Sequence, residues 1–379
     1  MTGPPRRVGL SLGLIDNPHD GLGEFCTQLV TRVARKAPEW RERYGVHFDV
    51  HLQPAWRGRF GDGVGYIDAY ESQRRQHEPQ QPHALWHTLH QLSRLLPPAG
   101  TARRLLTIHD LNYLQGRSWV SRWRYGRNMK ALLARTDAVV SISDYTRQVV
   151  LRHTPWQQAI SVIHNGVTDL SAQPQQPLPG FEAPRRRPFL LHLSRMAPSK
   201  NPQAILGLAR VWPEMDFLMC GPVSADSQAL QRAHPAPNVH FRLGVSDAQK
   251  AWAYGHCAGF VFPSFSEGFG LPPIEAMYFG KPVFLSRLTS LPEVGGDAAH
   301  YFDSFESLAM RQVVEQGLQT APARAAALRR HAQQFSWDRA AAAYLTLYAQ
   351  MLGLPTSAAQ ALGLPTSEAQ APGPPSSAG

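Results

Sequence analysis

The sequence predicts an α/β protein of two doubly wound domains that face a central cleft. Two series of short apolar runs, with helical patterns between the runs, support this fold class. The first series comprises 8–15, 48–52, 84–90, 104–110, 138–143 and 161–167, and the second comprises 188–195, 216–221, 239–244, 259–264, 282–286 and 299–303. Continuous apolar strands separated by helices are typical of parallel sheets that are covered on both faces. Such sheets bind ligands at the carboxyl ends of their strands.

Changes in composition set the expected domain limits. A Pro-, Gln- and Arg-rich stretch at 170–187 predicts a linker between a first domain at 1–169 and a second domain at 188–335. One further helix is expected at 336–351. The remainder, 352–379, contains a ten-residue repeat with so little apolar surface that we expect a disordered tail.

Composition bounds the chemistry of the chain. A net charge of +10 suits phosphate-bearing ligands, nucleic acid or an anionic membrane, and equally a solvated surface without a partner. The three cysteines are widely spaced and form no CxxC or CxxH pattern, which favours neither a zinc site nor a disulfide framework. The apolar run from Val8 to Ile15 is too short to span a membrane, so a cytoplasmic protein is expected.

The most informative stretch runs from Ser264 to Pro282. It contains a loop with Gly268 and Gly270, followed by a short helix that two prolines open. A glycine loop before a helix N-terminus is typical of a phosphate site, because free amides and the positive helix end meet there. Two carboxylates, Glu267 and Glu275, flank this site. Carboxylates repel phosphate, so they fit neutral hydroxyls better, and the arrangement suits a nucleotide sugar.

Two cations follow an earlier strand of the same half. Arg195 and Lys200 lie just past the strand that ends near 195, within reach of the expected cleft. Arginine grips phosphate oxygens through a planar fork, and lysine acts as a compact charge. Alone, the pair would be read as two solvated loop cations. Together with the glycine loop, it indicates a phosphate site.

The first half offers weaker signals. Gly21 and Gly23 follow the first strand, but a bare GxG is as often a simple turn. His109 ends an apolar strand, where it can donate to a ligand or carry a proton, although a lone histidine is more often structural. We find no Asp-x-Asp pair at a strand end and predict no metal, so Arg195, Lys200 and backbone amides would have to neutralise a diphosphate.

Several segments in a fixed order resemble the family 4 retaining glycosyltransferases of GT-B architecture, of the bacterial polysaccharide and lipopolysaccharide type. The resemblance covers roughly 8–350. The segments are SEGFGLPPIEAMYFGKPV with its Glu267-x7-Glu275 spacing, SRMAPSKN, HNGV, IHDL, ISDYTRQ and the GLG turn.

The resemblance implies a role for each candidate residue. Arg195 and Lys200 would hold the donor diphosphate, Glu275 the ribose and Glu267 the donor sugar. His109 would contact the donor sugar at the catalytic centre. The remaining donor-binding positions implied are the amides of the Gly268 loop at Phe269, Gly270 and Leu271, and a flexible loop at Gly21 and Gly23 beside the diphosphate and acceptor. The last helix would cross back onto the first domain.

The resemblance also implies an activity. The expected enzyme is a metal-independent, retaining hexosyltransferase that uses a GDP- or UDP-linked sugar, with mannose favoured, and no separate cofactor. The expected acceptor is a saccharide or lipid-linked saccharide at the inner membrane face, in cell-surface polysaccharide synthesis, and the basic charge suits peripheral membrane contact. The alternative is a non-catalytic nucleotide-sugar-binding relative in an assembly complex. Nucleic-acid binding would rest on charge alone and is not expected.

Overall fold

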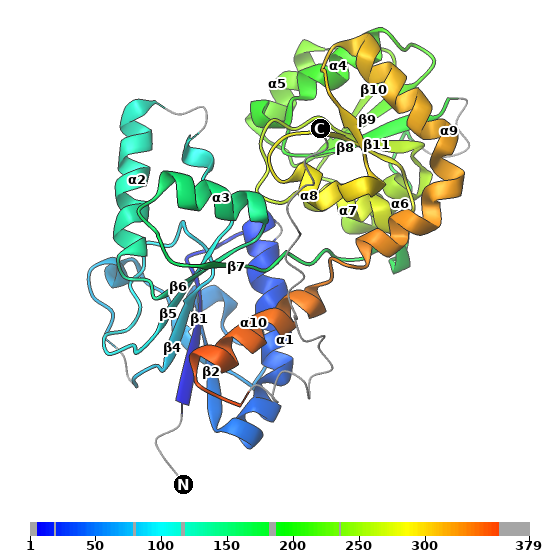
Figure 1. The fold of residues 1–379 in the computed structure, drawn as a ribbon. Helices are drawn as coiled ribbons and strands as arrows, with labels where there is room; N and C mark the ends of the chain where they lie inside the picture. Colours follow the sequence, from blue (N-terminus) through cyan, green and yellow to red (C-terminus); the bar gives the residue numbers. More distant parts are fainter. Residues whose placement is uncertain are drawn as a thin grey trace, which may run out of the picture.

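The computed structural model describes residues 6–18, 20–78, 81–114, 118–181, 187–234 and 236–355. Two α/β domains are stacked one above the other, each with a parallel sheet between helices (Figure 1). This confirms the predicted fold class. The predicted tail lies outside the described residues from 356 onward, as do residues 182–186 of the predicted linker.

The first sheet has the strand order β3-β2-β1-β4-β5-β6-β7 and is parallel throughout. The strands are β1 (Arg6–Gly13), β2 (Val46–Leu52), β3 (Gly65–Asp68), β4 (Leu85–Thr88), β5 (Arg104–Ile108), β6 (Ala138–Ser141) and β7 (Ile160–Val162). Its helices are α1 (Gly21–Tyr44), α2 (Trp119–Leu133) and α3 (Asp144–His153). The sequence did not predict β3, which is a half-buried edge strand and so lacks a continuous apolar run.

The second sheet has the parallel order β10-β9-β8-β11-β12-β13. The strands are β8 (Phe189–Leu193), β9 (Asp216–Gly221), β10 (Val239–Leu243), β11 (Gly259–Phe262), β12 (Val283–Ser286) and β13 (His300–Phe302). The helices are α4 (Pro202–Arg210), α5 (Ala225–Ala233), α6 (Asp247–His256), α7 (Leu271–Tyr278), α8 (Leu291–Gly295) and α9 (Ser307–Ala332). Short 3₁₀ turns occur at Pro54–Trp56, Glu71–Arg74, Asn112–Leu114, Leu170–Ala172, Pro198–Lys200 and Gly296–Ala298.

Both sheets reverse their strand order once, between β1 and β4 and between β8 and β11. A crevice opens at the carboxyl ends of parallel strands where the order reverses, because the flanking helices lie on opposite faces there. The predicted cations follow β8, and the predicted glycine loop follows β11. The topology therefore brings two separate segments of the second domain to one crevice.

The final helix, α10 (Trp337–Met351), returns to the first domain and packs beside α1 (Figure 1). Trp337, Tyr344 and Tyr348 are buried in the same apolar cluster as β1 and β2. A polar network fixes the helix: His87 on β4 bonds the Tyr348 hydroxyl at 2.6 Å and Thr107 at 2.8 Å, and Thr107 bonds Tyr344 at 3.0 Å. Burial lowers the pKa of His87 to about 3, so the ring is neutral.

The polar stretch between the domains is partly packed. Leu178 and Phe181 are buried in the apolar cluster of the second domain, against residues of β8 and α6. Two large apolar side chains are therefore enough to dock a stretch whose composition otherwise predicts a free linker.

None of the helices in the described part of the chain has both the length and the apolar composition that a membrane span requires.

We predict that Tyr348→Phe lowers the free energy of unfolding by about 1–3 kcal/mol, because it leaves a buried nitrogen of His87 without its partner. Urea titration of the purified protein measures the change. Tyr44→Phe is the matched control, since the Tyr44 hydroxyl has no hydrogen bond within the described part of the chain. Equal stabilities for the two variants would contradict the role of the network.

Candidate active site

A cleft of about 1410 Å³ lies between the two domains. Both domains line it, and the predicted site residues found there are Gly21, His109, Arg195, Lys200, Glu267, Gly268, Phe269, Gly270, Leu271 and Glu275. Gly23 is the one predicted residue that does not line it. Residues that are far apart in the sequence thus converge on one space large enough for a drug-sized or larger ligand.

The loop from Glu267 to Leu271 is held by the segment that follows β12. The Ser290 hydroxyl donates to the carbonyls of Glu267 and Phe269, at 3.1 and 3.0 Å. Gly270 has φ 103°, a conformation that favours glycine, and it stands at the N-cap of α7 without a side-chain cap. Because Pro272 and Pro273 have no amide N–H, the amides of Gly270 and Leu271 are the ones that this end of α7 can offer to an anion.

Lys200 and Glu267 form an ion pair in the cleft. Lys200 Nζ lies 2.6 Å from Glu267 Oε1, and the Ser264 hydroxyl donates to the same oxygen at 2.7 Å. The two charged side chains are only 13% and 10% exposed. The carboxylate thus fixes the lysine in place beside the N-terminus of α7 and partly neutralises it.

Arg195 differs from Lys200 in its surroundings. Its side chain is exposed at the cleft, and it has no hydrogen bond or ion pair with any residue that the structure describes. A guanidinium without a protein partner keeps all its donors for a ligand. Of the two predicted cations, Lys200 is therefore held by Glu267, whereas Arg195 has no hydrogen-bond or ion-pair partner within the described part of the chain.

Glu275 lies in the second turn of α7 and accepts a 2.6 Å hydrogen bond from the Tyr254 hydroxyl on α6. Burial raises the pKa of Glu275, although the bond from Tyr254 and the charge of Lys250 oppose this. Lys250 also lines the cleft and bonds Asp247 at 2.8 Å. The sequence had not indicated Tyr254 or Lys250, because α6 lies outside every motif that was recognised.

Glu24, on the first turn of α1, is a further cleft carboxylate, which the sequence did not indicate. The Thr168 hydroxyl donates to its Oε1 at 3.2 Å. Burial, followed by the charge of Glu275, raises the pKa of Glu24 to about 7. Because Glu24 is buried and the charge of Glu275 acts on it from the other domain, Glu24 is partly protonated near neutral pH.

His109 directly follows β5 and is buried. Its Nε2 lies 3.0 Å from the carbonyl of Leu89, so this nitrogen carries the proton and donates it. The ring meets Phe25 edge-on at 4.5 Å, and burial lowers the pKa of His109 to about 3. Only Nδ1 is left for a ligand, as an acceptor, and the lowered pKa keeps the ring neutral near pH 7.

Gly21 and Gly23 are not in a flexible loop, contrary to expectation. They form the first turn of α1, and the Asp20 carboxylate accepts a 2.7 Å bond from the Gly23 amide. A Cβ atom at Gly23 would lie 1.8 Å from the carbonyl oxygen of Asn17. This glycine is needed for a close chain approach, whereas Gly21 has open space around it and faces the cleft.

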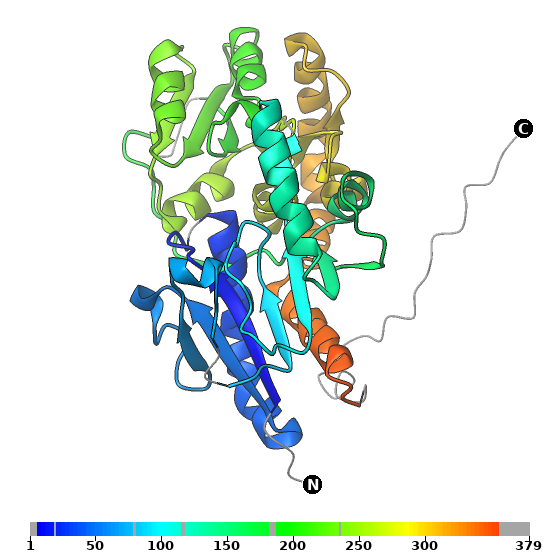
Figure 2. The ribbon, with the colours of Figure 1, turned by 90° about the vertical axis from the view of Figure 1, so that its left-hand side faces the viewer.

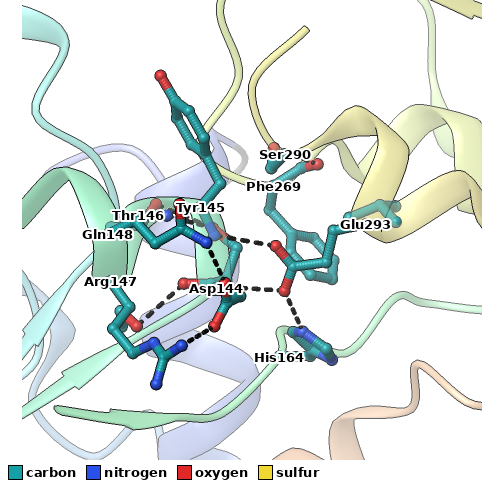
Figure 3. Close-up of polar contacts among 12 residues, drawn as sticks. Asp144, Tyr145, Thr146, Arg147, Gln148, His164, Phe269, Ser290 and Glu293 are labelled. Carbon is teal, nitrogen blue, oxygen red and sulfur yellow. Dashed lines mark hydrogen bonds and ion pairs between the residues drawn. The ribbon is translucent and has the colours of Figure 1, made fainter. Parts of the chain in front are cut away.

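The two domains meet at the N-terminus of α3 (Figure 3). Glu293 on α8 accepts hydrogen bonds from the amides of Asp144 at 2.7 Å and Tyr145 at 3.1 Å, and it bonds His164 at 2.6 Å. Burial would raise the pKa of Glu293, but these bonds outweigh it and lower the pKa. No motif in the sequence indicated this contact.

The same helix end also holds the glycine loop. The Ser143 hydroxyl, which caps α3, donates to the carbonyl of Gly268 at 2.8 Å. A Cβ atom at Gly268 would lie 2.3 Å from the carbonyl oxygen of His109. Gly268 is therefore a point of close contact between the loop of the second domain and the first domain.

Two sequence families match the chain. The family described as "Glycosyltransferase Family 4" matches residues 28–169, and the one described as "Glycosyl transferases group 1" matches residues 179–351. Together they cover both domains in the expected order. The chain belongs to the family 4 glycosyltransferases. The resemblance inferred from the motifs is confirmed.

Curated relatives of this glycosyltransferase include two mannosyltransferases of Escherichia coli. The O-antigen chain mannosyltransferase B is 25% identical over 370 residues, which covers 88% of this chain and 97% of the relative. The serotype-specific mannosyltransferase WbdA is 30% identical over 237 residues, which covers 56% of this chain and 29% of that longer protein.

Solved structures show the same two-domain fold. Sucrose-phosphate synthase from Thermosynechococcus elongatus aligns with a TM-score of 0.68 at 18% identity, covering 92% of this chain and 99% of that one. HepE from Anabaena in complex with UDP and glucose aligns with a TM-score of 0.64 at 15% identity, covering 90% and 99%. At such low identities these likenesses establish the GT-B architecture.

We predict that Glu293→Gln destabilises the protein by about 1.5–3 kcal/mol at neutral pH, because bonds to a charged group are lost. The folded pKa of Glu293 lies below its ordinary value of 4.5. Its stabilisation is therefore complete above that value and disappears as the pH falls through the folded pKa. Urea unfolding of both proteins at several pH values should show a difference that shrinks in acid.

Glu39→Gln serves as the matched control, because Glu39 forms only an exposed pair with Lys36. Its stability should follow the unmodified protein at every pH. A stability difference for Glu293→Gln that stays constant into acid would contradict the ion-linked contact.

Proposed function

We propose that the protein is a retaining, metal-independent mannosyltransferase of cell-surface polysaccharide synthesis. It takes the sugar from a nucleotide donor, with GDP-mannose favoured over UDP-sugars, and transfers it to a saccharide or lipid-linked saccharide. The observation that carries the proposal is the Lys200–Glu267 pair beside the uncapped N-terminus of α7, in the cleft that both domains line. The similarity to two mannosyltransferases supports the choice of sugar.

In this proposal the second domain binds the donor. The diphosphate occupies the N-terminus of α7, where it receives the amides of Gly270 and Leu271 and the charges of Arg195 and Lys200. Glu275, which lines the cleft, accepts hydrogen bonds from the ribose hydroxyls with the oxygen that Tyr254 does not occupy. Glu267 offers the sugar hydroxyls its second oxygen, because Lys200 and Ser264 already take the first.

The transfer proceeds on one face of the sugar. The bond between the anomeric carbon and the diphosphate oxygen breaks, and the acceptor oxygen bonds to the same carbon from the same side. The acceptor's proton passes to the departing diphosphate oxygen, so no protein nucleophile or metal is required. Arg195 and Lys200 stabilise the charge that grows on the leaving group, which is where fixed electrostatics contributes most.

His109 has a limited part in this scheme. Its Nε2–H is committed to the Leu89 carbonyl and its pKa is about 3, so the ring stays neutral and offers Nδ1 as an acceptor. A neutral acceptor can receive a hydroxyl of the donor sugar and orient it. We assign His109 to positioning of the sugar rather than to proton transfer.

We predict that Lys200→Gln lowers kcat by about 10²–10³, because it removes charge stabilisation from the leaving group while the amide can still bond Glu267. Glu275→Ala should instead weaken donor binding by about tenfold or more through the loss of its hydrogen bonds. Release of GDP or UDP from the corresponding sugar donors, with and without acceptor, gives both constants.

Lys36→Ala is the matched control, since Lys36 is exposed and pairs only with Glu39. It should leave kcat and the donor KM unchanged. Donor binding without turnover by the unmodified protein would favour a non-catalytic binding relative. Unaltered kinetics in both cleft variants would refute the donor site.

We also expect turnover to survive EDTA, and the anomeric configuration of the product to match that of the donor. In the part of the chain that the structure describes, no group of three or more His, Cys, Asp or Glu side chains is arranged to hold a metal. Proton NMR of the first product formed reads the anomeric configuration. An inverted product, or activity that EDTA abolishes and Mg²⁺ restores, would overturn the mechanism.

A further inference from the structure

Helix α2 exposes two tryptophans to solvent. Trp119 and Trp123 are 74% and 59% exposed, and Val120 beside them is 51% exposed. They are the only exposed tryptophans among the described residues, although the chain contains nine. Large apolar side chains grouped in this way on a surface usually mark an interaction site.

The exposed face of α2 is also basic. Positions 119, 123 and 127 are four residues apart and so lie on one face of the helix, where the Arg127 guanidinium stacks 4.9 Å from the Trp123 ring. Helical geometry adds Arg124 and Lys130 to that side, and both are exposed. Trp119–Leu133 contains four Arg and Lys residues and no Asp or Glu.

The other sides of α2 face the protein. Met129 and Leu133 are buried in an apolar cluster with β5 and β6. Tyr125, Asn128 and Leu132, on the adjoining side, line the cleft. Figure 2 shows α2 upright on the near side of the molecule, rising from the first domain beside the second. One helix thus has a wall of the cleft on one side and an aromatic, basic surface on the next.

We propose that the outward face of α2, formed by Trp119, Val120, Trp123, Arg124, Arg127 and Lys130, docks on an anionic phospholipid bilayer. The proposal rests on the proposed function, because it brings the cleft to a lipid-linked acceptor held in that bilayer. Tryptophan rings favour the interface between headgroups and acyl chains, and basic side chains beside an anionic leaflet each strengthen binding roughly fivefold. Interfacial helices combine these two features.

Charge selects the bilayer over other occupants of this face. A second copy of the chain would bring two faces of the same positive sign together, at a cost in repulsion. An electrically neutral bilayer or a neutral apolar partner would leave the basic side chains without counter-charges. An anionic bilayer satisfies the rings and the cations at once.

Vesicle co-sedimentation of the full chain tests the proposal. The unmodified protein should bind vesicles of phosphatidylcholine with 30% phosphatidylglycerol at low salt, and bind pure phosphatidylcholine far less. Trp119→Ser with Trp123→Ser should weaken binding about tenfold or more. Arg124→Glu with Arg127→Glu should weaken binding to the anionic vesicles on the order of a hundredfold or more. Brominated acyl chains should quench the fluorescence of the unmodified protein on binding.

Leu308→Ser is the matched control, since Leu308 is 65% exposed on α9 of the other domain and should not affect binding. Thermal melting checks that every variant is folded. Failure of the unmodified protein to bind anionic vesicles, or equal binding by the tryptophan variant, would overturn the proposal. Sedimentation of the unmodified protein as a dimer, with loss of the dimer in the tryptophan variant, would also overturn it, because a second copy would then occupy the face.

Donor turnover separates this proposal from the proposed function. The α2 variants should release nucleotide from the donor in water at the unmodified rate, because their altered side chains point away from the cleft. They should lose activity only toward an acceptor embedded in vesicles. If no donor is turned over by any form while vesicle binding depends on α2 as expected, the proposed function fails and the membrane face stands.

Discussion

The geometry of the cleft depends on the N-terminus of α3. The first amides of a helix have no partner within it. In α3, the Ser143 hydroxyl accepts one of these amides from within the first domain, and the Glu293 carboxylate of the second domain accepts two more. Ser143 also donates to the carbonyl of Gly268, so the glycine loop is aligned by the same contact. A helix cap thereby sets the distance between the glycine loop and the end of β5, which His109 follows.

Helix α10 provides a second restraint of a different kind. Its tyrosines are buried among the residues of the first domain, and the chain that leads to it comes from the second. Gly166 meets the backbone of Trp337 so closely that a Cβ atom would lie 2.1 Å from its amide nitrogen. The chain therefore crosses between the domains twice at one place, near Gly166 and Trp337. This limits how the domains can move while leaving the cleft open elsewhere.

The sequence predicted the features that are local in the chain. Strands such as Phe189–Leu193 are nearly all buried and read as apolar runs, whereas β3 is half-buried at an edge and was missed. The spacing of Glu267 and Glu275 lies within one loop and helix, so it too was visible. Glu293 and Asp144 are 149 residues apart, so no local spacing in the sequence signals the contact. The prediction of a flexible loop at Gly21 and Gly23 was wrong because Asp20 caps α1, so the helix already begins at Gly21 and includes both glycines.

Two groups of cations that contribute to the net charge of +10 differ in their exposure to solvent. Lys200 is 13% exposed and paired with Glu267, so salt screens it little and its effect is confined to a ligand in the cleft. The cations of α2 are exposed and have no acidic neighbour within the helix. Their attraction extends about 10 Å at 0.1 M salt and weakens as salt increases. The proposed binding of a donor and the proposed docking on an anionic bilayer would thus depend on separate charges, which substitutions can alter one at a time.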